Sequence, residues 1–172
     1  MPTYKIVVTG PFNSGKTQFV KTGSDIPIIE TEKNITTEDR GIKAQTTVAM
    51  DFGRVDLGDG DMVHLFGTPG QTRFSFMWEI LAKEMNGFIV LVDSTDGPSF
   101  PEAAELIRQF SSFVDVPYLV VANKADLEGA ASSEAVQSSM KLGPGHEVLS
   151  CVALDKTSVR QVIDRMLRLI RH

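Results

Sequence analysis

The 172-residue sequence contains a single cysteine, Cys151, which excludes an internal disulfide and a zinc site built on several thiolates. A reducing cytoplasm is therefore the simplest compartment. Histidine is also scarce, and the three histidines share no spacing typical of a metal site: they are His64, His146 and His172. The longest strongly apolar run near the middle, 88–92, is far too short to cross a bilayer. Neither end carries a signal stretch or a lipidation motif, so we expect no direct membrane anchor.

Basic charge is not in excess either. Seventeen Lys and Arg residues against 22 Asp and Glu residues give a formal net charge of −5. Nucleic acids and anionic membranes are bound by net basic faces, so neither is expected as a partner. The chain is instead 42% apolar and 23% charged, the balance of a soluble globular protein. Its length predicts one domain over residues 1–172.

Short runs rich in β-branched residues alternate with segments of helical period. Three unbroken apolar runs predict strands buried on both faces, which is typical of a parallel sheet; they span 4–9, 87–93 and 117–123. Two capping-box patterns predict helix starts, and they are Ser99 with Glu102 and Ser158 with Gln161. A Gly-Asp-Gly turn joins 47–57 to 61–66 and predicts a β-hairpin.

This alternation predicts an α/β fold of three layers, doubly wound around a mostly parallel six-stranded sheet with one antiparallel edge strand. In such sheets, ligands bind beyond the carboxyl ends of the strands. Segment 25–46 has little apolar periodicity and is rich in Thr, Glu and Lys, so we expect it to be a mobile loop.

A phosphate-binding loop is predicted directly after the first strand. Residues 10–17 read GPFNSGKT, the spacing G-x-x-x-x-G-K-[ST]. Backbone N–H groups of such a loop, here including Asn13 and Ser14, and the following helix N-terminus bind anionic oxygens. Gly10 is the first residue of the pattern. Glycine is expected at 15 because a β-carbon there would collide with a phosphate. Lys16 is expected to reach the β- and γ-phosphates, and Thr17 to offer its hydroxyl to Mg²⁺.

A base-selecting motif is predicted after the run that ends at residue 122. It reads Asn123-Lys124-Ala125-Asp126. The Asp126 carboxylate can accept hydrogen bonds from N1–H and the 2-amino group of guanine, whereas adenine offers no such pair. Lys124 is expected to lie along the base, and Asn123 to tie this loop to the phosphate loop. The pattern indicates guanine rather than adenine, which disfavours an ATP-dependent kinase or ATPase.

Together with three further stretches, these motifs resemble those of the Ras-like small GTPases over the whole chain. Residues 47–52 are similar to the switch I stretch, and 68–71 match switch II. Ser150-Cys151 is similar to the Ser-Ala loop that backs the guanine. Within the superfamily the chain looks most like a prokaryotic branch that includes MglA-type and conservon-type proteins, which typically work beside Roadblock/LC7-fold partners.

The resemblance implies a GTP-hydrolysing switch that uses Mg²⁺. Thr47 would bind Mg²⁺ through its hydroxyl and the γ-phosphate through its N–H, with adjacent Thr46 as the competing candidate. Gly70 would contact the γ-phosphate through its N–H, and Gln71 would orient the attacking water. Both switch contacts require GTP, so hydrolysis would release both loops.

Two positions depart from the family pattern. Gly67 stands where members usually carry an Asp that holds Mg²⁺ through a water. We expect weaker Mg²⁺ dependence, or compensation by another carboxylate such as Asp93 or Asp51. Phe12 stands where many members carry glycine, and its ring would crowd an inserted arginine. An internal arginine would then stabilise charge, with three candidates by position: Arg40, Arg54 and Arg73.

An aromatic segment after switch II predicts a partner surface. Phe74, Phe76 and Trp78 lie within one helical stretch, and one helix face suffices for the core. At least Phe76 or Trp78 is therefore expected to be exposed and to bind a regulator or effector. The alternative is a helix buried all round. A second open question concerns activity, because Gly67 and Phe12 favour a guanine-nucleotide-binding scaffold with negligible hydrolysis.

Overall fold

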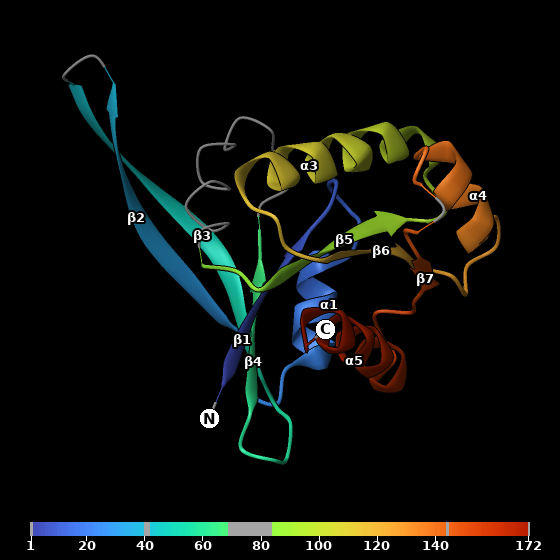
Figure 1. Ribbon diagram of the computed structural model, residues 1–172, viewed down its shortest axis with the longest axis horizontal. Helices are drawn as coiled ribbons and strands as arrows, with labels where there is room; N and C mark the ends of the chain where they lie inside the picture. Colours follow the sequence, from blue (N-terminus) through green and yellow to red (C-terminus); the bar gives the residue numbers. More distant parts are fainter. Residues whose placement is uncertain (1, 40–41, 69–83, 144, 172) are drawn as a thin grey trace.

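The computed structural model describes residues 2–39, 42–68, 84–143 and 145–171. Its strands are β1 (Thr3–Thr9), β2 (Ile29–Asp39), β3 (Ile42–Asp56), β4 (Met62–Gly67), β5 (Gly87–Asp93), β6 (Tyr118–Asn123) and β7 (Val148–Ser150). They form one seven-stranded sheet in the order β2-β3-β4-β1-β5-β6-β7 (Figure 1). Neighbours from β4 to β7 are parallel, while β3 runs antiparallel to β4. The expected mostly parallel sheet is confirmed.

Helices cover both faces of this sheet (Figure 1). Their bounds are α1 (Lys16–Gly23), α3 (Phe100–Phe113), α4 (Ser133–Ser139) and α5 (Lys156–Arg171). Alternate residues of β1 face opposite layers: Ile6 belongs to a core cluster with Phe19 of α1 and Ile163 of α5. Val7 belongs to a second cluster with Phe110 of α3. The three-layer α/β fold predicted from the sequence is therefore confirmed.

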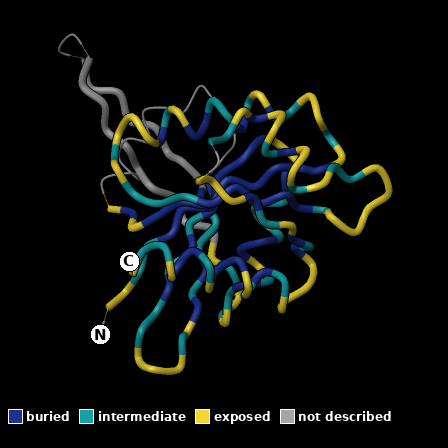
Figure 2. Tube along the Cα trace, turned by 45° about the vertical axis from the view of Figure 1, so that its right-hand side comes forward, coloured by how far each residue is buried: buried dark blue, intermediate teal, exposed yellow. Residues whose placement is uncertain are grey.

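The centre of the sheet is buried from solvent. Every residue of β5 is buried, which accounts for its unbroken apolar sequence. Figure 2 shows the buried central strands with exposed turns around them. No helix within the described residues is both long enough and apolar enough to span a bilayer.

The expectation of a mobile loop over 25–46 is wrong. Residues 29–39 form β2 and pair antiparallel with β3, from Ile29 opposite Phe52 to Asp39 opposite Ile42. This hairpin extends away from the rest of the sheet (Figure 1) and adds a seventh strand to the six expected. Thr and Ile favour strands, but polar residues on both faces leave no apolar alternation. Cross-strand pairing, which single-segment periodicity does not detect, stabilises such a ribbon.

The helix start predicted at Ser99 is confirmed, because α3 begins at Phe100, but the Ser99 side chain does not make the expected cap and α5 begins before Ser158. The Ser99 hydroxyl donates to the Asp96 carbonyl at 2.7 Å, so it closes the preceding 3₁₀ turn and caps no amide of α3. Helix α5 starts at Lys156, so its capping position is residue 155, three residues before the expected Ser158. Asp155 accepts a hydrogen bond from the Thr157 N–H at 3.0 Å. A carboxylate also interacts favourably with the positive end of the helix dipole, so Asp155 fits this place better than serine.

Candidate nucleotide-binding site

The loop between β1 and α1 is held against the ends of two neighbouring strands. A β-carbon added at Gly10 would lie 2.2 Å from the Leu91 carbonyl oxygen. One added at Gly15, which has φ of 100°, would lie 2.3 Å from Asn123 Nδ2. These glycines are required by the close approach of the protein's own chain, in addition to the phosphate contact expected at Gly15. Contacts within the protein thus help to set the geometry of the loop.

Lys16 is folded back over this loop. Its Nζ donates to the carbonyl oxygens of Gly10 at 2.7 Å and Pro11 at 2.9 Å. Burial lowers the pKa of Lys16 from 10.5 to about 8, although the Glu102 and Asp51 carboxylates act in the opposite direction. An ammonium group beside a helix N-terminus favours anionic oxygens such as those of phosphate.

Asn123, at the end of β6, joins three loops. Its side chain is 2% exposed, and its Nδ2 donates to the Ser14 carbonyl at 2.9 Å. Its Oδ1 accepts from the Ala153 N–H at 3.0 Å. The expected tie to the phosphate loop is therefore present. The third loop was missed because its contact uses a backbone amide, which no side-chain motif announces.

Lys124 provides a second tie to the phosphate loop. It has a left-handed backbone, with φ of 61°, and its Nζ donates to the Asn13 carbonyl at 2.9 Å. The same Nζ lies 2.8 Å from Asp93 Oδ2 at the end of β5. Burial would raise the pKa of Asp93, but hydrogen bonds from Lys124 and Thr95 together lower it. Asp93 is therefore committed to Lys124 and Thr95, whereas the hydroxyl of Thr17 donates to Asp51.

The residues expected around the base occupy two adjoining loops. Asp126 is exposed. Ser150 ends β7 and is exposed, whereas Cys151 is buried and its N–H donates to the Ala122 carbonyl at 2.9 Å. The Ala125 N–H donates in turn to the Cys151 carbonyl at 3.2 Å. The loop that carries Asp126 is thereby fixed to the loop that follows β7.

The metal side of the site contains oxygen donors next to the phosphate loop. Thr17 Oγ1 donates to Asp51 Oδ2 at 2.6 Å. Among the described residues, no group of three His, Cys, Asp or Glu side chains could hold a metal ion. A hydroxyl and one carboxylate fit Mg²⁺, which is usually bound by one or two protein oxygens together with phosphates and water.

Several predicted site residues lie outside the described residues. These are Arg40, Gly70, Gln71, Arg73, Phe74, Phe76 and Trp78. Thr47 belongs to β3, where its backbone is opposite Asn34, but its side chain is outside the description. Arg54 is misplaced for a role at the phosphates. Arg54 on β3 pairs with His64 on β4, and His64 pairs with Lys5 near the start of β1. The phosphate loop follows the opposite end of β1.

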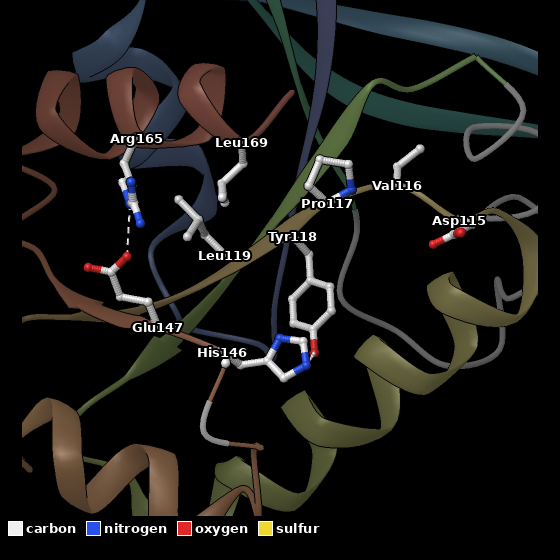
Figure 3. A pocket seen from close by; sticks show the side chains of 10 residues that line it. Asp115, Val116, Pro117, Tyr118, Leu119, His146, Glu147, Arg165 and Leu169 are labelled. Atoms are coloured by element: carbon white, nitrogen blue, oxygen red, sulfur yellow. Dashed lines mark hydrogen bonds and ion pairs between the residues drawn. The ribbon is translucent and has the colours of Figure 1, made fainter. Parts of the chain in front are cut away.

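A separate hollow of about 360 Å³ lies at the start of β6, between that strand and α5 (Figure 3). The Tyr118 and His146 rings stack there with their centroids 4.9 Å apart. Arg165 and Glu147 form an ion pair of 2.8 Å on the other side of the hollow. Asn123 is at the opposite end of the same strand, so this hollow is distinct from the phosphate-loop site.

The α/β fold, the phosphate loop after β1 and the Asn-Lys-Ala-Asp loop after β6 define a nucleotide-binding protein of the Ras-like GTPase superfamily. Within that class, the chain belongs to the family described as conserved hypothetical ATP binding protein, whose model matches residues 25–170.

Named relatives cover most of the chain. It is 31% identical over 163 residues to an uncharacterized protein of Methanocaldococcus jannaschii, covering 95% of this chain and 94% of that protein. It is 29% identical over 179 residues to ADP-ribosylation factor-related protein 1 of Rattus norvegicus, covering 97% and 85% of the two chains. It is also 29% identical over 130 residues to ADP-ribosylation factor-like protein 8b of Arabidopsis thaliana, covering 71% and 70%.

Proposed function

We propose that this protein is a guanine-nucleotide-binding molecular switch that hydrolyses GTP to GDP and phosphate. The observation that carries the proposal is the pair of bridges from Asn123 and Lys124 to the phosphate loop. These bridges hold the loop bearing Asp126 in a fixed relation to the loop bearing Lys16. A site that is preorganised in this way binds the base and the phosphates of one nucleotide together.

Guanine is favoured over adenine by the exposed Asp126 carboxylate. Adenine has no pair of donors for it and would leave the carboxylate unpaired. The family description names ATP, so an adenine nucleotide is the first competitor to test. The ADP-ribosylation factor relatives support membership of the GTPase superfamily by similarity.

Hydrolysis would use positioning and charge stabilisation rather than covalent chemistry. In this proposal Lys16 binds the β- and γ-phosphates, and Thr17 and Thr47 hold Mg²⁺, which neutralises charge on the phosphates when bound. Gly70 contacts the γ-phosphate and Gln71 orients the attacking water. With Arg54 placed near the other end of β1, Arg40 and Arg73 remain as candidates for an internal arginine.

A scaffold that binds guanine nucleotide with negligible hydrolysis is the second candidate. Gly67 supports it because this position lacks the usual carboxylate. Phe12 also supports it because its ring, 77% exposed on the phosphate loop, crowds the approach of an arginine from a partner. Gln71 and Thr47 support the switch.

The partner proposal rests on sequence. We assign Phe74, Phe76 and Trp78 to a surface that binds a regulator or effector, and a Roadblock/LC7-fold protein is the proposed class. This assignment follows the resemblance to the prokaryotic MglA-type and conservon-type branch. The near full-length similarity to the Methanocaldococcus jannaschii protein is compatible with that placement.

The first experiment identifies the nucleotide and then its fate. Purified protein is denatured, the released nucleotide is identified by chromatography, and phosphate release from loaded GTP is followed under single-turnover conditions. A switch gives guanine nucleotide and measurable phosphate, at a rate near 10⁻⁴ s⁻¹ without an arginine at the phosphates. A scaffold gives guanine nucleotide without phosphate release, and adenine nucleotide would overturn both.

Asp126→Asn tests the base assignment directly. Loss of the carboxylate removes two charge-assisted hydrogen bonds, so the preference for GDP over ADP should fall by about 100-fold or more. Competition against a fluorescent guanine nucleotide measures this ratio. Ser133→Ala on α4 is the control and should keep the wild-type ratio. An unchanged ratio for Asp126→Asn would exclude the guanine assignment.

A further inference from the structure

The buried Gly67 at the end of β4 faces a carboxylate from the neighbouring strand. In the antiparallel register of β3 and β4, Asp51 is directly opposite Gly67. A β-carbon added at Gly67 would lie 3.4 Å from Asp51 Cβ and 3.6 Å from Asp51 Oδ2. The Asp51 carboxylate therefore adjoins the space that a side chain at position 67 would enter.

The same carboxylate contacts the phosphate loop. Asp51 Oδ2 accepts a hydrogen bond from Thr17 Oγ1 at 2.6 Å, and Thr17 lies in the first turn of α1. Among the side chains that the structure describes, no Lys or Arg forms an ion pair with Asp51. Its carboxylate is thus held against the Thr17 hydroxyl, and the Lys16 ammonium interacts with it electrostatically without forming an ion pair.

We infer that Asp51 supplies the carboxylate that binds Mg²⁺ beside Thr17, in place of the missing side chain at position 67. This inference rests on the proposed binding of Mg²⁺ with guanine nucleotide. Of the two alternatives expected from the sequence, it selects compensation over weaker Mg²⁺ dependence: the carboxylate is retained, but on β3 in place of the start of switch II. Asp93, the other candidate, is committed to Lys124.

A purely structural role for Asp51 gives a different result. A hydrogen bond to Thr17 near the N-terminus of α1 would stabilise the helix without any metal. Asn at position 51 keeps a side-chain oxygen for the Thr17 hydroxyl but removes the negative charge. Asp51→Asn therefore preserves the structural contact and weakens the metal site.

The test measures release of a fluorescent GDP analogue as free Mg²⁺ is varied from micromolar to 10 mM and then removed with EDTA. Wild-type protein should release nucleotide slowly in Mg²⁺ and much faster in EDTA. Asp51→Asn should raise the Mg²⁺ concentration at half effect by about 10- to 100-fold, the usual loss when a group supporting a metal is removed. Asp56→Asn, the same change on the exposed end of β3, should leave the midpoint at the wild-type value.

A relocation variant completes the design. Asp51→Ala combined with Gly67→Asp moves the carboxylate to the usual position, where the nearest neighbours leave ordinary van der Waals contact. This double variant should recover at least part of the wild-type Mg²⁺ midpoint, whereas Asp51→Ala alone should not. Recovery also shows that the protein folds without the Asp51 side chain.

The outcomes separate the inference from the proposed function. If wild-type protein binds no guanine nucleotide, the proposed function fails, and the inference fails with it. If it binds nucleotide and responds to EDTA, but Asp51→Asn shows the wild-type Mg²⁺ midpoint, only the inference is overturned. The inference is also overturned if nucleotide release from wild-type protein is the same in Mg²⁺ and in EDTA.

Discussion

Asn123 is a single buried amide whose donor and acceptor are both used. Its Nδ2 donates to the Ser14 carbonyl and its Oδ1 accepts from the Ala153 N–H, so one side chain connects the phosphate loop with the loops that follow β6 and β7. A buried polar group that is fully satisfied specifies one arrangement, because any other arrangement leaves these groups unpaired. The base and phosphate halves of the site are therefore coupled through this residue.

Asn123→Ala should lower both stability and nucleotide affinity. The unpaired Ala153 N–H alone costs about 1–3 kcal/mol in the free energy of unfolding. Nucleotide affinity should fall by about tenfold or more because the loops must then be ordered on binding. Urea unfolding and fluorescent nucleotide titration measure the two effects. Asn86→Ala, which removes an exposed hydrogen bond from the Lys5 N–H, should leave the affinity unchanged.

Lys16 should make nucleotide affinity depend on pH. Burial lowers its pKa to about 8, and phosphate oxygens beside it would favour the charged form. Binding therefore takes up a proton above pH 8, so affinity should fall as pH rises, approaching tenfold per unit. Titrations between pH 7.5 and 9.5 measure this slope. Lys16→Met should bind more weakly but keep only the dependence due to the purine itself, and equal slopes would contradict the assignment.

At the site, the sequence predicts which residues carry the functional groups better than it predicts which residues they contact. The spacing of Gly10, Gly15 and Lys16 identifies the phosphate loop because the chemistry requires those residue types. The contact between Asp51 and Thr17 could be suggested only as one of two possibilities, since it depends on strand register. The role of Ala153 could not be predicted at all, because every residue except proline has a backbone N–H.

At the scale of elements, strand pairing and helix capping determine the strands and helix ends that local sequence patterns do not predict. The buried strands β1, β5 and β6 were predicted because a run of apolar residues is enough to identify them. Strand β2 was not, because its stabilisation comes from a long antiparallel partner. The cap of α5 was placed three residues late because both an aspartate and a serine are suited to this position, and only the structure shows that Asp155 accepts from an amide at the helix start.

The cap of α5 can be tested by a matched pair of variants. Asp155→Ala should lower the free energy of unfolding by about 1 kcal/mol, the usual cost of losing an N-cap. Ser99→Ala should cost less because its hydroxyl caps no amide of α3. Thermal or urea unfolding compares the two. A larger loss for Ser99→Ala would contradict the capping assignment.

At the scale of the whole molecule, two aspartates connect separate parts of the fold. Asp25 follows α1 and forms an ion pair with Arg160 of α5 at 2.5 Å, while Asp93 joins β5 to the loop after β6. Burial alone would raise the pKa of Asp25, but the Asp56 N–H and the Arg160 guanidinium together lower it. Both carboxylates therefore have a folded-state pKa below the ordinary value of 3.8.

Stability should consequently fall in acid. A carboxyl group whose pKa is lower in the folded state than in the unfolded state stabilises the protein at pH values above its unfolded-state pKa. This contribution is lost as the pH falls through the folded-state pKa. The melting temperature of the wild-type protein should fall as the pH is lowered below 3.8. The double variant Asp25→Asn/Asp93→Asn should be less stable than wild type at pH 7, but its melting temperature should depend less on pH in acid. Asp164→Asn, an exposed change on α5, should follow the wild-type curve.

The two edge strands of the sheet differ in how readily they could pair with another chain. β7 is three residues long, whereas β2 extends over 11 residues and has no strand beyond it among the described residues. A long open margin is a template on which a second chain can add a strand and begin aggregation. The sequence of β2 opposes this through its charged residues, which are Glu30, Glu32, Lys33, Glu38 and Asp39. Replacing them with apolar residues would turn the projecting ribbon into a point of uncontrolled polymerisation.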